Sequence, residues 1–261
     1  MYYGCKKEID DKRDYKMKVC YTYDMFPESF ELQMPKVKDQ SIVNSCVAHS
    51  LSTFMEQTHK DEKLDFSVGF IYGYRPISYS QDEGMYPREA LKTLQKIGDV
   101  ENNYFNYNKE MPEIKQLVDN NMQTLLPLAE LYKIYSYSRI YTIDEIKKCI
   151  YSGTPVPVSI PVYNNLQYNK STFIINTPDG KLNGYHMVII YGWNKEGFLI
   201  QNSWGKDWAN NGRAILPYTY EIDSAWAIST EDNSIYTYQT IWQKLYSLIR
   251  NIINTIKKGA K

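Results

Sequence analysis

The feature that most constrains the fold is a change of hydrophobic period near the middle of the chain. In residues 46–57 and again in residues 87–97, apolar side chains recur every three or four positions, which is the spacing of one helix face. From Pro155 onward, runs such as PVPVSIPV, MVIIY and FLIQNSW are typical of buried strands. Helices in the first half and strands in the second predict an α+β fold with two lobes.

Start and stop signals give approximate boundaries for these elements. We expect helices to begin at four positions: Cys46, Pro87, Pro112 and Thr142. Thr142 is followed three residues later by Glu145, which predicts a capping box. Asn194 to Gly197 is expected to form the turn between the last two strands. The segment between the first two helices is rich in turn residues.

These patterns divide the chain into four regions. We expect an N-terminal extension over residues 1–26, a helical lobe over 27–132, a β-rich lobe over 133–232 and a C-terminal amphipathic helix over 233–261. The last helix is basic. We expect it to pack back on its own domain rather than on a membrane or a partner, because apolar stripes ordinarily face a core.

Composition excludes several classes of function. Lys plus Arg and Asp plus Glu both number 30, and this zero net charge does not indicate nucleic-acid binding. No run of about 18 apolar residues is present to span a bilayer. The chain begins with charged residues and lacks the apolar segment of a secretory signal, so we expect a cytoplasmic protein or one released without such a signal.

Cysteine and histidine usage argues against a metal centre. Four cysteines lie far apart, no C-x-x-C pair occurs, and the chain has only three histidines. This spacing fits neither structural zinc nor a disulfide framework, so we expect a reducing compartment, no metal and no cofactor.

Cys46 is the first candidate for chemistry. It follows Asn44 and Ser45, either of which can cap the helix. A sulfur at the positive end of a helix dipole is favoured as the thiolate, the form that attacks carbonyls. Gln40 stands six positions earlier, and its amide can donate a hydrogen bond to an oxyanion formed beside the sulfur.

His186 and Asn202 are the candidates for a base and its orienting partner. His186 begins one expected strand and Asn202 ends the next, sixteen positions later, so an antiparallel pair can bring them together. The asparagine oxygen would fix the histidine tautomer and aim the other ring nitrogen at the cysteine. Trp204 can shield that hydrogen bond from water.

Each of these residues also has a purely structural interpretation. A free cysteine is usually an inert buried side chain, a strand histidine is usually structural, and NSWG can be a strand end before a turn. His49, one helical turn after Cys46, is expected to be packed or hydrogen-bonded within its helix. The complete set of Gln, Cys, His and Asn, in an order that a two-lobed cleft can assemble, favours catalysis.

The same residues resemble the papain family of cysteine proteases. The spacing from Gln40 to Cys46 matches that family. So does the spacing from His186 to Asn202, with the Ser-Trp-Gly that follows. EGMYP followed by REAL resembles the family's substrate-binding loop and the next helix. The similarity extends over about residues 27–228 and is greatest to the bacterial members made without a secretory signal.

The resemblance implies a helical left lobe, an antiparallel β-barrel right lobe and an active-site cleft between them. It also implies catalytic roles: Cys46 as nucleophile, His186 as general base and then acid, Asn202 as orienting residue, and Gln40 with the Cys46 backbone N–H as oxyanion hole. The residues expected to bind substrate are Gly84, Met85, Tyr86, Ser159, Tyr185 and Trp204. Of these, Met85 and Ser159 are expected near the pocket for the second residue before the scissile bond.

The sequence departs from the family pattern at several positions. Val43 stands where many members have a disulfide cysteine, and Val47 replaces the usual aromatic residue after the nucleophile. Met85 stands where a second glycine is common. These departures leave the groove shape and the substrate preference open.

The main hypothesis is therefore a papain-like cysteine endopeptidase that hydrolyses peptide or protein substrates through an acyl-enzyme. Two alternatives are another Cys-His acyl-transfer enzyme, such as a transglutaminase-like or cell-wall-peptide hydrolase, and a catalytically idle homologue that binds peptides. We also expect residues 1–26 to lie over or near the cleft and to restrain activity, as a pro-segment does.

Overall fold

The computed structural model describes residues 3–12, 14–16, 26–59, 63–75, 84–163 and 166–230. The expected C-terminal helix, within residues 233–261, lies outside the described residues. The four-region division of the chain stays a prediction.

The helices fall in the first two thirds of the described chain and the strands mostly follow them. The helices are α1 (Cys46–His59), α2 (Val68–Gly73), α3 (Pro87–Lys96), α4 (Glu113–Ala129), the 3-10 helix η2 (Glu130–Tyr132) and α5 (Ile143–Tyr151). The strands are β1 (Phe30–Glu31), β2 (Ser136–Ile140), β3 (Val156–Tyr163), β4 (Leu182–Trp193), β5 (Gly197–Gln201), β6 (Arg213–Pro217) and β7 (Ser224–Ser229). The expected α+β class is confirmed.

The helix starts predicted from sequence are confirmed at α1, α3, α4 and α5. Helix α2 was not expected, because the segment around it is rich in turn residues and the helix is only six residues long. It forms because Ser67 caps it, with the hydroxyl oxygen accepting the N–H of Phe70. It is then covered by α1 and α4.

The strands form one antiparallel sheet in the order β2-β7-β3-β4-β5-β6, with β1 added on β4. The expected β-barrel is not closed, since no pairing joins β2 to β6 within the described residues. Other segments take both outer edges. Lys16 bridges Arg139 on β2, and Ile174 bridges Ile215 on β6.

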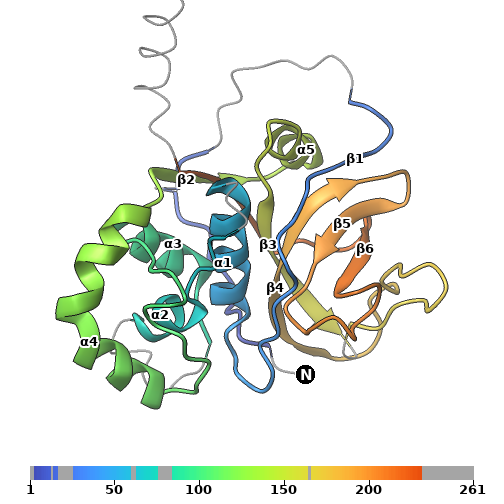
Figure 1. The fold of residues 1–261 in the computed structure, drawn as a ribbon. Coiled ribbons are helices and arrows are strands. Elements are labelled where there is room, and N and C mark those ends of the chain that lie inside the picture. Colours follow the sequence, from blue (N-terminus) through green and yellow to red (C-terminus); the bar gives the residue numbers. More distant parts are fainter. Residues whose placement is uncertain are drawn as a thin grey trace, which may run out of the picture.

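Helix α1 lies between the helices and the sheet (Figure 1). Every residue from Cys46 to Gln57 is buried, because α2 and α3 pack on one side of α1 and β3 and β4 on the other. The hydroxyl of Ser50 donates to the carbonyl oxygen of Met187 on β4 at 3.0 Å and ties the helix to the sheet. The first residue of α1 is therefore held at the boundary between the two parts.

A second core fills the far side of the sheet. It joins α5 to β3, β4, β5 and β6, with Trp193 and Phe198 among its largest side chains. Every residue of β3 except Tyr163 is buried, which explains why its sequence up to Val162 is apolar apart from Ser159. Among the described residues, no helix combines the length and apolar content needed to cross a membrane.

The capping box at the start of α5 can be tested by replacing Thr142. Thr142 Oγ1 accepts the N–H of Glu145 at 3.2 Å, and Glu145 Oε2 accepts the N–H of Thr142 at 3.1 Å. We expect Thr142→Ala to lower the free energy of unfolding by about 1 kcal/mol, measured by urea denaturation. Thr142→Ser keeps the hydroxyl and serves as control. An equal loss in both variants would contradict the capping explanation.

Candidate active site

Cys46 is completely buried at the start of α1, beside β4. The backbone N–H groups of Met187 and Gly4 lie close enough to its sulfur to lower the pKa of the thiol, as do those of Val47 and of Cys46 itself. Met187 directly follows His186 on β4. The fold therefore brings the predicted nucleophile against the strand that carries the predicted base.

His186 and Asn202 are joined across β4 and β5. Register between these strands pairs Ile189 with Gln201, so the two side chains lie at the same end of the ladder. His186 Nε2 and Asn202 Oδ1 are 2.7 Å apart. An amide oxygen only accepts, so the proton is on Nε2 and Nδ1 keeps its lone pair. Nδ1 is buried and has no hydrogen-bond partner among the described residues.

Trp204 covers the histidine ring. The two rings stack with centroids 4.4 Å apart and planes inclined by 25°. Trp204 also contacts Trp208 edge to face at 5.5 Å. The arrangement fits the expected shielding of the His186–Asn202 hydrogen bond from water.

Gln40 lies next to this group and is fully buried. Its Nε2 donates to the carbonyl oxygen of Val43 at 2.9 Å, and its Oε1 accepts from the Ser203 hydroxyl at 2.7 Å. Sequence reasoning did not assign a role to Ser203. Its position directly after Asn202 is the signal that could have indicated a role. Asn202 orients His186, and the next residue, Ser203, orients Gln40.

The described part of the N-terminal region, residues 3–12 and 14–16, is called the arm below. Its first residues lie between Met85, just before α3, and Tyr185 on β4, and the place that they fill is called the groove below. Cys5 N–H donates to the Tyr185 carbonyl oxygen at 3.3 Å, and Lys6 N–H donates to that of Met85 at 2.9 Å. Met85 N–H donates to the Gly4 carbonyl oxygen at 2.8 Å. The arm thus adds a backbone ladder between the helical part and the sheet.

The side chains of the arm occupy successive positions along the site. Tyr3 contacts the rings of His186 and Trp204 edge to face, with centroids 6.4 and 6.1 Å away. The Cys5 thiol donates to the Ser159 hydroxyl at 3.2 Å. Between them is Gly4. A Cβ on Gly4 would lie 1.8 Å from the carbonyl oxygen of the neighbouring Asn44, so only glycine fits there.

The arm runs in the direction opposite to that expected of a substrate. Cys5 occupies the position expected for the second residue before a scissile bond, near Met85 and Ser159. In a substrate the next residue along the chain would reach the sulfur, but in the arm it is the preceding residue, Gly4. An amide N–H rather than a carbonyl carbon therefore faces Cys46.

The remaining residues expected to bind substrate also border the arm. A Cβ on Gly84 would be 3.1 Å from the Lys6 side chain. Lys6 Nζ lies 5.2 Å from the ring centroid of Tyr86. Among the described residues, no group of three or more His, Cys, Asp or Glu side chains is arranged to hold a metal ion.

The charge state of the pair differs from the sequence expectation. A helix start was expected to favour the thiolate, but burial raises the pKa of Cys46 to about 11, against the smaller effect of the backbone N–H groups. Burial also lowers the pKa of His186 to about 4. Both groups are therefore neutral at pH 7 while the arm covers them.

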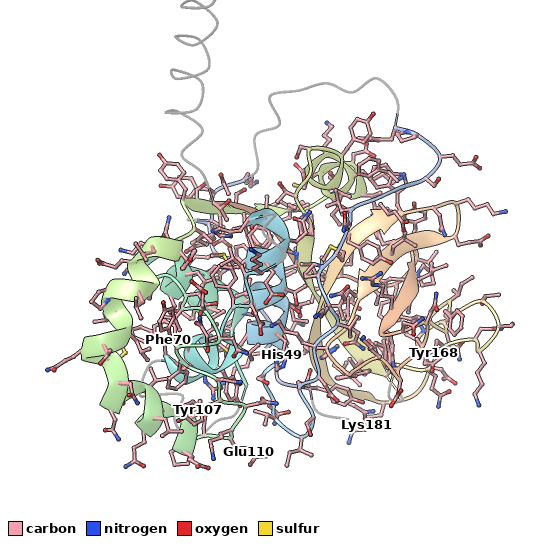
Figure 2. All side chains as sticks on the ribbon, viewed as in Figure 1. His49, Phe70, Tyr107, Glu110, Tyr168 and Lys181 are labelled. Carbon is pink, nitrogen blue, oxygen red and sulfur yellow. The ribbon has the colours of Figure 1, made fainter. Side chains whose placement is uncertain are left out.

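His49 lies on α1 in the middle of the molecule (Figure 2). Its Nδ1 is 3.1 Å from Ser45 Oγ and 3.0 Å from the Ser45 carbonyl oxygen. Burial lowers its pKa to about 4. It is a packed and hydrogen-bonded helix residue, as expected.

Sequence reasoning missed the residues that hold the acidic part of the arm. Arg88 on α3 pairs with Glu8 and Asp14, and Arg139 on β2 pairs with Asp10. These partners lie 74 to 129 positions apart in sequence. The only local signal is a cation in the first turn of a helix, at Arg88, where a negative charge is usual.

A helix-borne cysteine beside a hydrogen-bonded histidine–asparagine pair is the arrangement of Cys-His acyl-transfer sites. Comparison with known proteins narrows this class. The model of the papain family of cysteine proteases matches residues 26–223, and the chain therefore belongs to that family.

Individual relatives agree with this assignment. An uncharacterized peptidase C1-like protein of Acanthamoeba polyphaga mimivirus is 26% identical over 202 residues, which cover 71% of this chain and 65% of that protein. Cathepsin B-like cysteine proteinase 2 of Haemonchus contortus is 30% identical over 105 residues, 39% of this chain and 30% of its own length. The chain thus matches about two thirds or less of the length of these relatives.

Solved structures confirm the papain-like fold. Xylellain, a cysteine protease from Xylella fastidiosa, superposes with a TM-score of 0.73 at 27% identity and covers 88% of this chain and 96% of its own. Procathepsin B S9 of Trypanosoma congolense gives a TM-score of 0.66 at 16% identity, with 87% of each chain covered.

The pKa values give a prediction for thiol reactivity. Because only the thiolate is alkylated, iodoacetamide should modify Cys46 slowly at pH 7, and the rate should rise toward a midpoint near the pKa of about 11. Gly4→Ala, which removes the arm from the sulfur, should move the midpoint to lower pH. Rates would be read at Cys46 by peptide mass spectrometry. A midpoint near 8.5 in the unchanged protein would contradict burial as the cause.

Proposed function

We propose that this protein is a cysteine endopeptidase that uses Cys46, His186 and Asn202 and is restrained by its own arm. The observation that carries the proposal is the His186–Asn202 hydrogen bond of 2.7 Å. It leaves Nδ1 as the basic nitrogen on the strand that contacts the Cys46 sulfur. Membership of the papain family supports the same reaction.

The reaction begins when the arm has left the groove. Water and substrate then replace the arm, burial of the pair is reduced, and His186 Nδ1 takes the proton of Cys46. The thiolate attacks the substrate carbonyl carbon, and the C=O π electrons move to oxygen. When this intermediate collapses, the C–N bond breaks, and the imidazolium gives its proton to the departing amine.

The second half regenerates the enzyme. His186 accepts a proton from water as the water attacks the thioester carbonyl carbon. The C–S bond breaks, the product leaves as a carboxylic acid, and the proton returns to the sulfur. Asn202 holds the ring in one tautomer through both steps, as the orienting residue of a triad does.

The negative oxygen of each intermediate is assigned to Gln40 and the Cys46 backbone N–H. The Cys46 N–H is at the start of α1, where backbone donors point outward. The Gln40 amide is fixed by Ser203 and Val43, so it is oriented before substrate arrives. Preorganised donors of this kind stabilise the transition state without a further reorganisation cost.

Replacing the nucleophile tests the proposed reaction. Cys46→Ala should lower the turnover of a fluorogenic peptide by at least about a thousandfold and abolish labelling by an epoxide-type thiol inhibitor. Cys149→Ala is the matched control, because Cys149 is also a buried cysteine but lies on α5, away from Cys46 and the arm. Peptide hydrolysis that survives Cys46→Ala would rule the mechanism out.

The arm is proposed as the restraint on this activity. It fills the position of the substrate, and its reversed direction presents the Gly4 N–H instead of a carbonyl carbon to the sulfur. It also keeps Cys46 and His186 neutral by covering them. The arm would therefore block both substrate binding and ionisation of the pair.

A single side chain on the arm tests this restraint. Gly4→Ala creates a contact of 1.8 Å with the Asn44 carbonyl oxygen, so the arm cannot remain in place. Turnover of a small peptide should rise about tenfold or more. Ile9→Ala is the control, since the Ile9 side chain is 76% exposed and does not fill the groove. Unchanged turnover in Gly4→Ala would contradict a restraining arm.

A further inference from the structure

The carboxylates of the arm gather on two arginines outside the catalytic residues. Arg88 Nη1 lies 2.7 Å from Glu8 Oε2, and its Nε and Nη2 donate to the two Asp14 oxygens at 2.9 and 2.6 Å. Arg139 Nη2 donates to Asp10 Oδ1 at 3.2 Å. The side chains of Glu8 and Asp14 are only 1% and 7% exposed. Two-pronged contacts of this kind are strong and geometrically selective.

Trp226 on β7 lies close to both arginines. The guanidinium carbons of Arg88 and Arg139 are 5.5 and 4.9 Å from its ring centroid. Trp226 is fully buried and fixed in the sheet. Its ring therefore holds both cations in position by packing and cation–π attraction. These three residues, Arg88, Arg139 and Trp226, are called the carboxylate site.

A carboxylate of the arm also lies at the start of α3. Arg88 is the second residue of this helix, where a cation faces the positive end of the helix dipole, and Glu89 follows it in the first turn. Tyr86, the residue before the helix, makes no side-chain capping bond. Glu8 Oε1 instead accepts the Arg88 backbone N–H at 2.7 Å. One carboxylate of the arm thus accepts both a backbone N–H at the helix start and a guanidinium N–H of the same residue.

The carboxylate site has donors beyond those that the arm uses. Arg139 is 4% exposed, and its Nε and Nη1 are buried without a hydrogen-bond partner among the described residues. Beside them, Asp223 Oδ2 accepts the backbone N–H of Glu8 at 3.2 Å. The site therefore offers cationic donors to acidic side chains and one acceptor to the main chain that carries them.

We propose that the carboxylate site is a peptide-binding exosite for acidic segments, which the arm occupies first and acidic substrates occupy after the arm leaves. Only the second half of this inference, the binding of acidic substrates, rests on the proposed peptidase function. Binding of an acidic peptide requires the fold and the two arginines, whether or not Cys46 reacts.

The arm also shows where a substrate would meet this site. Cys5 contacts Ser159, and Glu8 follows three residues later, roughly 10 Å along an extended chain. The Ser159 region is where the second residue before the scissile bond is expected, and the reversed arm makes its later residues correspond to earlier residues of a substrate. The exosite therefore faces about the fifth residue before that bond, and an acidic residue is expected there.

Peptide binding in trans tests the exosite apart from catalysis. The protein is the full chain with Cys46→Ala to prevent turnover, and with Gly4→Ala, Glu8→Gln and Asp14→Asn to remove its own arm from competition. The probes are two fluorescent peptides copying residues 3–16 with Cys5→Ser. One keeps the carboxylates at positions 8 and 14, and the other has Gln and Asn there. Binding is read by fluorescence anisotropy.

The acidic peptide should bind about tenfold more tightly than the amide peptide at low salt. Adding Arg88→Gln to the protein should remove this difference, and Arg88→Lys should restore part of it, since lysine keeps the charge but not the fork. Equal binding of the two peptides would overturn the proposal. So would a difference that survives Arg88→Gln.

A salt titration keeps the test decisive if Arg88→Gln fails to fold. Affinity for the acidic peptide should fall steeply between 0.05 and 0.5 M NaCl, whereas affinity for the amide peptide, which keeps only the Asp10 contact with Arg139, should fall less steeply. Parallel salt dependence of the two peptides would contradict the exosite.

Cleavage rates then test the substrate half. In the Gly4→Ala protein, kcat/KM should be higher for a peptide with Glu five residues before the scissile bond than for its Gln counterpart. Absence of cleavage in both would count against the peptidase proposal and leave the binding result standing. If the Glu and Gln peptides were cleaved equally although binding depended on carboxylates, the substrate half of the proposal would be wrong. The site would then bind the arm alone.

Discussion

The packing of α1 between the helices and the sheet is the constraint on which the rest of the structure depends. A helix that is buried on all sides cannot shift without disturbing both cores. The Ser50 hydroxyl fixes it to the Met187 carbonyl, one residue after His186. Because Cys46 begins the same helix, the contact between α1 and β4 sets where the sulfur lies relative to the imidazole. The arm lies along that contact, with Gly4 beside the sulfur and Cys5 bonded to the Tyr185 carbonyl oxygen.

Local elements were predictable because their causes lie within a few residues. Pro87 at the start of α3 and the Thr142–Glu145 box at the start of α5 fix those helices from within. Strand β7, with sequence SAWAIS, was not predicted. It exists because β2 and β3 pair with it from both sides, and these strands are distant in sequence. The two outer strands of the sheet, β2 and β6, are likewise bridged by residues from other parts of the chain, Lys16 and Ile174, which local sequence patterns do not reveal.

The candidate site was likewise predictable only in part. Spacing was enough to select Cys46, His186 and Asn202 and to place them near one another, because a helix start and a two-strand ladder are regular structures. The expected thiolate was wrong for the covered site. Desolvation depends on what lies above a group, and no pattern around Cys46 predicts that Gly4 will lie there. The ion pair between Arg88 and Glu8 was not predicted either, because the two residues lie far apart in the sequence.

The arm contacts Met85 and Arg88 on the helical part, and Tyr185 and Arg139 on the sheet. It therefore connects these two parts of the molecule by hydrogen bonds and ion pairs. Loss of the arm from this place would therefore also remove hydrogen bonds and ion pairs that connect the helical part to the sheet. Under the proposed function, the covered form would be the more stable one, and the open form would regain stability when a substrate binds in the place of the arm.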